Sequence, residues 1–476
     1  MTKRLFPKNS AGLLIVVLFS LAFVVRLYRI ENPIADWHAW RQADTSAVSK
    51  RFVEDGIDIL HPKYFDISNI QSGKDNPNGY RMVEFPILNV FQAGAFLLLP
   101  KLSLEVWGRL IVSILYLAGA FFLYLFSKKH FGSKAGFFAL FYYLFLPFGI
   151  YYSRTILPDP LMISFIIAGI YAFDRYLEGK NKIAWIVLSF IFVSLSFLAK
   201  PYTVFFLPVF VVMLYLKYGL KFVKKVELIA FGIACIVPLL LWRKWIGNYP
   251  EGIPVSSWLF NEGNIRFKGA FFYWIFGERI GKLILGYFGS SLLMLGLLIN
   301  GKRNILFYSF ILSAMLYVSI IARGNVQHDY YQIFLLPIIA ITLGRGASFI
   351  IDQQKKYVGI GFVLLITIMS FAFSWYYVRD YFNINNIAFV HAGQRADEIL
   401  PTDARVIAPF DGDTSFLYYI NRPGWPAFQQ PIEEMIKMGA THLVIAGPTE
   451  NDVKGFGTQY KIVDSSPEYL ILDIRQ

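Results

Sequence analysis

The stretch from Asp36 to Thr45 concentrates side chains that can do chemistry. Its ten residues, DWHAWRQADT, contain the carboxylates Asp36 and Asp44 together with Arg41, a histidine and two tryptophans. A carboxylate can accept the proton of a hydroxyl nucleophile, and a guanidinium can hold a phosphate through paired hydrogen bonds. The stretch follows the first apolar segment of the chain, so it is predicted to lie at the edge of a membrane.

Further ionisable and aromatic side chains occur near the ends of later apolar segments. In chain order they are Glu84, Arg109, Arg154, Asp159, Lys200, Tyr202, His328 and Tyr331. An ionisable side chain at membrane depth costs roughly 2.5–3.5 kcal/mol or more, so such residues tend to pair or to line a cavity. These residues are predicted to gather at one membrane face, and none clusters at the bilayer centre as a transport pathway would require.

The composition is that of a multi-span membrane protein. Of the 476 residues, 56% are hydrophobic and only 16% are charged, which is too apolar for an ordinary soluble protein. The net charge of +13 does not indicate a nucleic-acid partner: residues 381–476 hold 7 Lys and Arg against 12 Asp and Glu, a net −5, which leaves +18 for the first 380 residues. The single cysteine, Cys235, excludes an intramolecular disulfide and a cysteine-rich zinc site.

About eleven membrane spans are predicted, with the N-terminus in the cytoplasm. Residues 11–25 form the first apolar run, and basic residues precede it. The other predicted spans are 106–126, 135–152, 160–177, 183–199, 201–217, 226–245, 281–300, 304–322, 331–350 and 357–377. Lys and Arg concentrate in alternate loops on the side of the N-terminus, as the positive-inside rule requires. The segments 31–103 and 246–280 are therefore predicted to face outward.

The first outer loop, residues 31–103, is predicted to contain two helices. Residues 44–55 have helical spacing, with Asp44 near the start, where the helix dipole favours a carboxylate. Glu84-Phe85-Pro86 precedes an apolar helix over 87–100. That helix is short for a span and is expected to lie along the membrane surface.

Residues 381–476 are predicted to form a small α/β domain on the outer side. Helices are expected at 391–400 and 431–438, and strands at 405–408, 442–446, 460–463 and 469–474. The predicted fold class is thus an all-α polytopic membrane protein, residues 1–380, with a small C-terminal α/β extracytoplasmic domain, residues 381–476.

Glycosyl transfer from a polyprenyl-phosphate sugar fits these groups. A phosphate leaving group needs charge neutralisation rather than a strong acid, and the acceptor hydroxyl needs a base, which a carboxylate can provide. Attack opposite the leaving group inverts the anomeric centre through an oxocarbenium-like state. The lipid tail would stay in the bilayer, which explains a site at the membrane edge.

The order of these motifs resembles the GT-C superfamily, specifically the branch of protein O-mannosyltransferases and lipid A aminoarabinose transferases (glycosyltransferase family 39). The resemblance covers roughly residues 10–350. It rests on Asp44 in the first outer loop, Glu84-Phe85-Pro86, Gly108-Arg109-Leu110, Leu157-Pro158-Asp159, Leu198-Ala199-Lys200-Pro201, and His328-Asp329-Tyr330-Tyr331 before Leu336-Pro337. The family often has an Asp-Glu pair in the first loop, whereas Thr45 follows Asp44 here, so Asp36 and Asp44 both stand as candidates for the base.

The predicted site assigns catalysis to Asp44 and Glu84. Donor binding is assigned to Arg41, Arg109, Arg154, Asp159, Lys200, Tyr202, His328 and Tyr331. Structural alternatives are a helix cap for Asp44, an ion pair of Glu84 with Arg81 or Arg109, and interfacial anchoring for Lys200 and Arg154. Asp44, Glu84 and His328 are a conceivable metal set, but no metal or other cofactor is expected.

The expected partners are a polyprenyl-phosphate-linked sugar, an acceptor that is a lipid, a glycan or a protein, and the cell membrane itself. A transporter or a lipid-linked-sugar flippase is the main alternative, and it would require polar residues through the helix bundle. A membrane oligosaccharide polymerase or ligase is a third option. The sugar and the acceptor are not specified by the sequence.

Overall fold

The computed structural model describes residues 8–179, 181–299 and 304–475. The chain divides into two compact units. Unit 1 comprises residues 1–28, 110–242 and 256–380, and unit 2 comprises residues 29–109, 243–255 and 381–476. The first outer loop therefore groups with the C-terminal residues, whereas the sequence placed a single boundary at residue 380.

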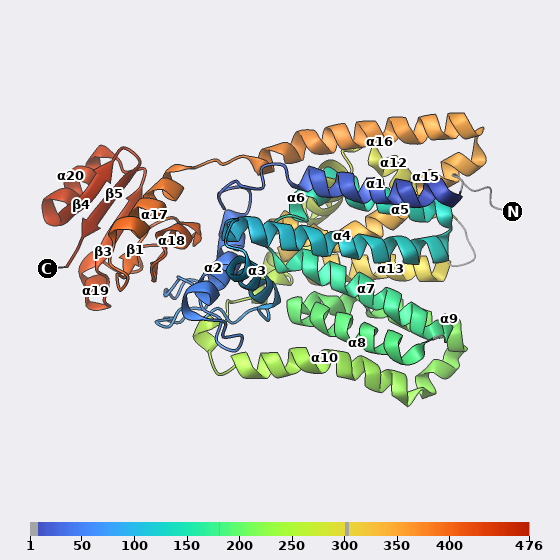
Figure 1. Cartoon of the computed structure of the whole chain (residues 1–476), viewed down its shortest axis with the longest axis horizontal. Coiled ribbons are helices and arrows are strands. Elements are labelled where there is room, and N and C mark those ends of the chain that lie inside the picture. The colour runs from blue at the N-terminus through green and yellow to red at the C-terminus, as the bar shows by residue number, and fades with distance from the viewer. Residues whose placement is uncertain (1–7, 180, 300–303, 476) are drawn as a thin grey trace. The chain divides into compact units, whose positions relative to one another are not determined.

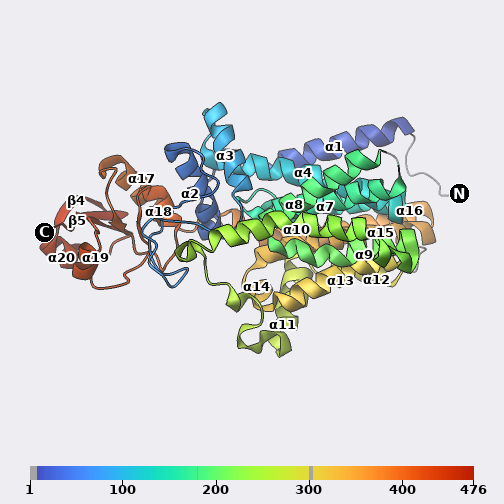
Figure 2. The same cartoon turned by 90° about the horizontal axis from the view of Figure 1, so that it is seen from below.

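Unit 1 is a bundle of helices that run side by side (Figures 1 and 2). Its longer helices are α1 (Lys8–Arg26), α4 (Leu104–Phe131, of which residues 104–109 belong to unit 2), α5 (Ser133–Phe145), α7 (Pro158–Glu178), α8 (Lys182–Ala199), α9 (Leu207–Tyr218), α10 (Val226–Ile246, of which residues 243–246 belong to unit 2), α12 (Gly289–Leu298), α13 (Asn304–Ile320), α15 (Leu336–Gln353) and α16 (Lys356–Val378). Shorter helical pieces of unit 1 are α6 (Pro147–Tyr152), η1 (Pro201–Phe206), η2 (Gly219–Lys224), η4 (Ser257–Leu259), η5 (Glu262–Phe267), α11 (Gly269–Phe272), the π-helix η6 (Tyr273–Ile284), α14 (Ala322–Gln327) and η7 (Asp329–Leu335). η3 (Pro250–Gly252) belongs to unit 2, and η8 (Arg379–Phe382) crosses the boundary between the units.

Close packing in this bundle depends on small residues. α7 packs along α8, and α15 packs along both α5 and α12. A side chain at Gly344 in α15 would overlap the backbone of Ala135 and Ala139 in α5. Small residues allow such close approach between membrane helices, where van der Waals packing replaces the hydrophobic effect.

Unit 1 is built to cross a membrane. Among the described residues, seven helices are long and apolar enough to span it, and an eighth span results if the pair Gly269–Ile284 and Gly289–Leu298, bent by 117°, is counted as one. Apolar helices of 10–17 residues add Gly12–Arg26 and Asn304–Ile320 in this unit. Each of the eleven predicted segments corresponds to a helix, but the segment 135–152 is interrupted before Pro147 and the segment 281–300 includes the 117° bend. The exact number of spans stays a prediction.

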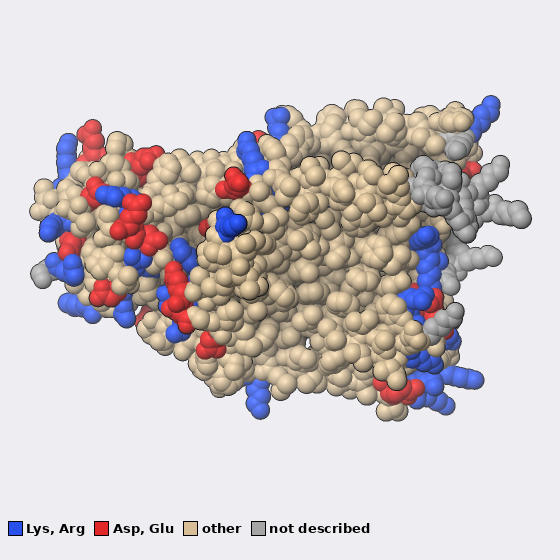
Figure 3. Space-filling view, viewed as in Figure 1, with Lys and Arg blue, Asp and Glu red and all other residues tan. Residues whose placement is uncertain are grey.

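Charge is distributed unevenly over the bundle. Figure 3 shows a broad flank with few charged side chains and a gathering of Lys and Arg at the end where α4 and α7 finish. The last turn of α4 contains Lys128 and Lys129, and the last turn of α7 contains Arg175. An apolar flank with basic residues at one end is the pattern of a bundle that sits in a bilayer. The protein is therefore a multi-pass membrane protein, and its orientation stays a prediction.

Unit 2 combines the first outer loop with a five-stranded sheet. The loop contains α2 (Ala39–Asp55) and α3 (Ile87–Leu98). The sheet has the order β2-β1-β3-β5-β4, in which β2, β1 and β3 are parallel and β5 is antiparallel to β3 and β4. In chain order, the helices and strands of the C-terminal part of unit 2 are α17 (Ala388–Ile399), β1 (Val406–Ile407), α18 (Ser415–Ile420), β2 (Gly424–Trp425), α19 (Ile432–Lys437), β3 (His442–Ala446), α20 (Glu450–Gln459), β4 (Lys461–Ser466) and β5 (Tyr469–Asp473) (Figure 1).

The first outer loop extends this sheet at the β2 edge. Gly424 donates its backbone N–H to the carbonyl of Phe65, and its own carbonyl accepts from the N–H of Ile67. Ile67 also belongs to the apolar core that contains Trp425 and Leu443. Backbone pairing and shared core packing therefore join two segments that are more than 300 residues apart in the sequence.

Most elements of unit 2 lie where the sequence predicted them. The predicted strands at 405–408, 442–446, 460–463 and 469–474 match β1, β3, β4 and β5. The sequence missed β2, which has two residues, and α18 and α20. The helix predicted from Asp44 begins earlier, at Ala39, so Asp44 lies in the second turn of α2 and is not a helix cap.

Candidate active site

Asp44 lies on the buried face of α2 and is 0% exposed. One carboxylate oxygen accepts a hydrogen bond of 2.7 Å from Nη2 of Arg81. The other accepts one of 2.6 Å from Oγ1 of Thr414, which directly precedes α18. Burial of a carboxylate is tolerated when it is paired and hydrogen-bonded, and both conditions hold here.

Arg41 and Glu84 form the second ion pair of this cluster. Nη2 of Arg41 lies 2.5 Å from Oε1 of Glu84, and the two side chains are 7% and 17% exposed. Arg41 lies one turn before Thr45 and also donates to its hydroxyl. Glu84 lies just before α3, so this pair connects α2 to the segment leading into α3.

Asp36 and Arg109 form the third pair, at 3.8 Å, and both side chains are at most 1% exposed. Nε2 of Gln42 donates to Asp36 at 2.8 Å. Arg109 also donates to the carbonyls of Ile30 and Asn32. Its guanidinium thus anchors the chain that leads into the DWHAWRQADT stretch, in addition to balancing the Asp36 charge.

Two further carboxylates lie near this cluster and were not singled out from the sequence. Burial raises the pKa of Asp66 to about 6, and the Asp44 charge adds to that effect. Burial also raises the pKa of Asp413 above its ordinary value. Gln42, Arg81 and Thr414 were likewise outside the predicted site. Arg81 appeared in the sequence only as an alternative partner of Glu84, and its position in the same loop as Asp44 was the available signal.

Unit 1 contains a second cluster, centred on Lys200. Nζ of Lys200 lies 3.0 Å from Oδ2 of Asp159, and the side chains are 7% and 3% exposed. The rings of Tyr202, Tyr330 and Tyr331 surround the ammonium, with centroids 5.4, 5.6 and 5.3 Å from Nζ. Asp159 is in the first turn of α7 and Lys200 caps the C-terminus of α8, so each charge is at the helix end that the dipole favours.

The other predicted residues of unit 1 occupy buried or half-buried positions. Arg154 is 1% exposed and donates to the carbonyl of Tyr28 at 2.5 Å. The His328 ring packs on Tyr330 and Tyr331 and stands edge-on to Trp258. Asp329 accepts a hydrogen bond of 2.5 Å from the hydroxyl of Tyr152. Predicted residues Asp159, Lys200, Tyr202, His328 and Tyr331 therefore gather in one polar region of unit 1.

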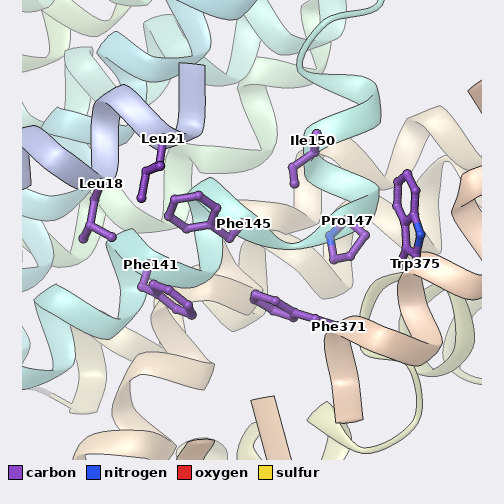
Figure 4. A pocket seen from close by; sticks show the side chains of 8 residues that line it. All are labelled: Leu18, Leu21, Phe141, Phe145, Pro147, Ile150, Phe371 and Trp375. Carbon is purple, nitrogen blue, oxygen red and sulfur yellow. The ribbon is translucent and has the colours of Figure 1, made fainter. Parts of the chain in front are cut away.

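Unit 1 also carries an apolar groove of about 440 Å³. Leu18 of α1, Phe145 of α5, and Phe371 and Trp375 of α16 line it (Figure 4). With so little polar surface, the groove suits hydrocarbon rather than a sugar or a phosphate.

Within the described residues, no group of three or more His, Cys, Asp or Glu side chains could hold a metal ion.

Comparison with solved structures identifies the fold. The chain superposes on ArnT from Cupriavidus metallidurans bound to undecaprenyl phosphate with a TM-score of 0.69 and 12% identity, covering 98% of this chain and 99% of that one. It also matches the oligosaccharyltransferase AglB from Archaeoglobus fulgidus in complex with an inhibitory peptide and a dolichol-phosphate (TM-score 0.56, 12% identity, 91% and 69% covered) and the mycobacterial arabinofuranosyltransferase AftD (0.58, 13%, 100% and 42%). The chain therefore shares the fold of these three solved proteins.

A family model adds a sequence-level similarity. Residues 86–242 match the model of the dolichyl-phosphate-mannose-protein mannosyltransferase family. The matched segment runs from the start of α3 into α10 and includes Arg109, Arg154, Asp159 and Lys200. No curated protein gives a significant sequence match to the chain.

Proposed function

We propose that this protein is an integral-membrane, inverting glycosyltransferase that moves a sugar from a polyprenyl-phosphate donor to an acceptor on the extracytoplasmic side. The observation that carries the proposal is the carboxylate–arginine cluster of unit 2 in a chain that shares the fold of ArnT over 98% of its length. The solved ArnT holds undecaprenyl phosphate and the solved AglB holds a dolichol-phosphate, which supports a lipid-phosphate donor here.

The proposed reaction is a single displacement. The acceptor oxygen bonds to the anomeric carbon as the bond from that carbon to the phosphate oxygen breaks. The acceptor proton passes to a carboxylate, and the polyprenyl phosphate leaves with the bonding electron pair. Because the leaving group is already anionic, cations contribute more than a general acid.

Asp44 and Asp36 are the two candidates for the base. Asp44 is sealed between Arg81 and Thr414, so it would act only after exchanging one of these partners for the acceptor hydroxyl. Asp36 belongs to the lining of a cavity of about 280 Å³ within unit 2. Its side chain is only 1% exposed and accepts a hydrogen bond from Gln42, so it too would have to release a partner before it takes the acceptor proton. Glu84, paired with Arg41 and 17% exposed, is assigned to positioning the acceptor.

Donor binding is assigned to cations, with Lys200 first among them. Its charge is balanced by Asp159 at 3.0 Å, and a lipid phosphate would share the ammonium with that carboxylate. Within unit 1, Arg154 is assigned to the same phosphate, and the rings of Tyr202, Tyr331 and His328 would surround it. Arg41 and Arg109 belong to unit 2 and are assigned to donor binding separately, within that unit. No cofactor is part of the proposal.

Transfer from a defined donor tests the function. The purified chain in liposomes would be given a panel of radiolabelled polyprenyl-phosphate sugars with a membrane extract as acceptor source, and products would be identified by mass. Consumption of one donor with formation of a glycosylated product is expected. Transbilayer movement of the donor without transfer would favour the flippase alternative and overturn the proposal.

A further inference from the structure

The DWHAWRQADT stretch lines one cavity of unit 2 together with residues from the C-terminal part of the chain. Ala35–Trp40 form one wall, and Asn386, Asp413 and Ser415 contribute to the other. The backbone N–H of Trp37 donates to the carbonyl of Tyr381, and the two rings stack at 5.0 Å with 15° between their planes. The volume is about 280 Å³, just below the roughly 300–1,000 Å³ typical of ligand sites.

The lining combines aromatic faces with hydrogen-bonding groups. Trp37, Trp40 and Phe410 supply apolar ring surface, and Trp37 keeps 41% of its surface exposed. Asp36, Asp413 and Asn386 supply carboxylate and amide oxygens, which accept hydrogen bonds from hydroxyl groups. A pyranose ring has this same division, because its C–H faces are apolar and its edge carries hydroxyls.

Ser415 gives an independent indication of a ligand. The residue is 0% exposed, and its hydroxyl has no hydrogen-bond partner in the part of the chain that the structure describes. Its backbone N–H donates at 2.7 Å to Asp413, which fixes that carboxylate beside it. A buried polar group without a partner is costly and rare, and a ligand hydroxyl would satisfy it.

The charges of the cavity narrow the class of ligand. Two carboxylates disfavour a phosphate or a uronic acid, although Arg109 at 3.8 Å from Asp36 balances one of them. The apolar groove of unit 1 is different in kind, with nearly no polar lining. The unit 2 cavity therefore fits a polar ring that is uncharged or carries an amine.

We propose that this cavity is the acceptor subsite and that it binds a pyranose residue that is uncharged or carries an amine. The acceptor role rests on the proposed transferase function, whereas sugar binding does not. Of the two candidate bases, Asp36 is then the one that lines the acceptor cavity, and it would take the acceptor proton after Gln42 releases its carboxylate.

Ligand-detected NMR on the full chain in detergent tests the binding. The probes are methyl α-glucopyranoside, methyl glucosaminide and methyl glucuronide. Saturation transfer to the first two is expected and to the third is not. Trp37→Ala should weaken binding about fivefold to tenfold, and Ser415→Ala should weaken it while leaving the melting temperature unchanged or higher. Trp274→Ala, which removes an exposed tryptophan from unit 1, is the matched control.

The outcomes separate this inference from the proposed function. If no pyranoside shows saturation transfer with the folded wild type, the sugar site would be wrong. Equal binding by Trp37→Ala and wild type would also overturn it. Displacement of the pyranoside by polyprenyl-phosphate mannose would show a donor site and overturn the acceptor role. If the chain binds the pyranoside but transfers sugar from none of the donors tested, the sugar site would stand. The transferase function and the acceptor role of the site would then be wrong.

Discussion

Arg81 reaches Asp44 across 37 positions of sequence and donates a hydrogen bond of 2.7 Å to a carboxylate that is fully buried. Thr414 completes the environment of that carboxylate from a segment 370 residues away. The most conspicuous acidic residue of the first outer loop is therefore held in a closed environment that joins that loop to the C-terminal part of unit 2.

Removal of Arg81 is expected to destabilise unit 2. Arg81→Met leaves the Asp44 charge buried without its main partner, and breaking a buried pair in this way costs about 3–5 kcal/mol. Thermal unfolding in detergent, followed by tryptophan fluorescence, should show a clearly lower midpoint. Lys74→Met, at an exposed position of the same loop, should leave the midpoint unchanged.

The double variant Asp44→Asn/Arg81→Met separates structure from catalysis at this pair. It removes both charges, so stability should largely return. If activity returns with it, Asp44 has a structural role and is not the base. If stability returns while turnover stays low, Asp44 takes part in the reaction.

Asp36→Asn is expected to lower turnover by about 10²–10⁴-fold, the usual range for loss of a general base. Binding of the donor should not weaken, because the variant removes a proton acceptor and no cation, and it leaves Arg109 without its counter-ion. Single-turnover rates and donor affinity would be measured separately, with Asp75→Asn as an exposed control in the same loop. Turnover near the wild-type rate would contradict a base role for Asp36.

Lys200→Ala is expected to raise the Kd for polyprenyl phosphate about tenfold or more, because the phosphate loses a desolvated cation. Asp159→Asn should act in the opposite direction on affinity, since it leaves the Lys200 charge without its counter-ion. Binding would be measured by tryptophan quenching in detergent, with Lys268→Ala as an exposed control in unit 1. Equal affinities for wild type and Lys200→Ala would remove Lys200 from the donor site.

The raised pKa of Asp66 predicts how stability depends on pH. Burial holds this pKa at about 6 in the folded chain, against 3.8 ordinarily, so the folded state binds more protons than the unfolded state between these values. Protonated Asp66 therefore contributes to the free energy of unfolding at low pH, and this contribution is lost as the pH rises through about 4–6. By pH 7 the cost is on the order of 3 kcal/mol.

Asp66→Asn should remove that cost. The gain in melting temperature over wild type is expected to grow from pH 4 to pH 7, as measured by thermal unfolding across that range. Asp75→Asn gives the baseline for an exposed carboxylate. A gain that is the same at all pH values would show that burial does not disfavour the Asp66 charge.

The C-terminus is expected to lie on the side of the membrane opposite the N-terminus. This follows from the concentration of Lys and Arg in alternate loops, which the positive-inside rule assigns to the cytoplasm. A reporter that is active only in the cytoplasm, fused after residue 476, should be silent. A fusion within the basic loop 217–225 should be active and is the control, so the reverse pattern would overturn the predicted orientation.

Much of the fold was accessible from the sequence because its signals are local. Apolar runs near twenty residues predicted the spans, and short apolar runs in the C-terminal part predicted β1, β3, β4 and β5. The interruption before Pro147 and the 117° bend before Gly289 were not anticipated. A hydropathy window averages over such breaks, because a broken span is as apolar as a straight one.

The sequence by itself determined the class of protein and the residues available for chemistry. Its composition required a membrane fold, and its motifs named Asp36, Arg41, Asp44 and Glu84 in one loop and Lys200 with Asp159 in others. Only the tertiary structure decided the pairing: Asp44 with Arg81 and Thr414, Glu84 with Arg41, and Asp36 with Arg109 beside a cavity. Which charge balances which depends on separations of a few ångströms and on burial, and the chain sets these only when distant segments fold together.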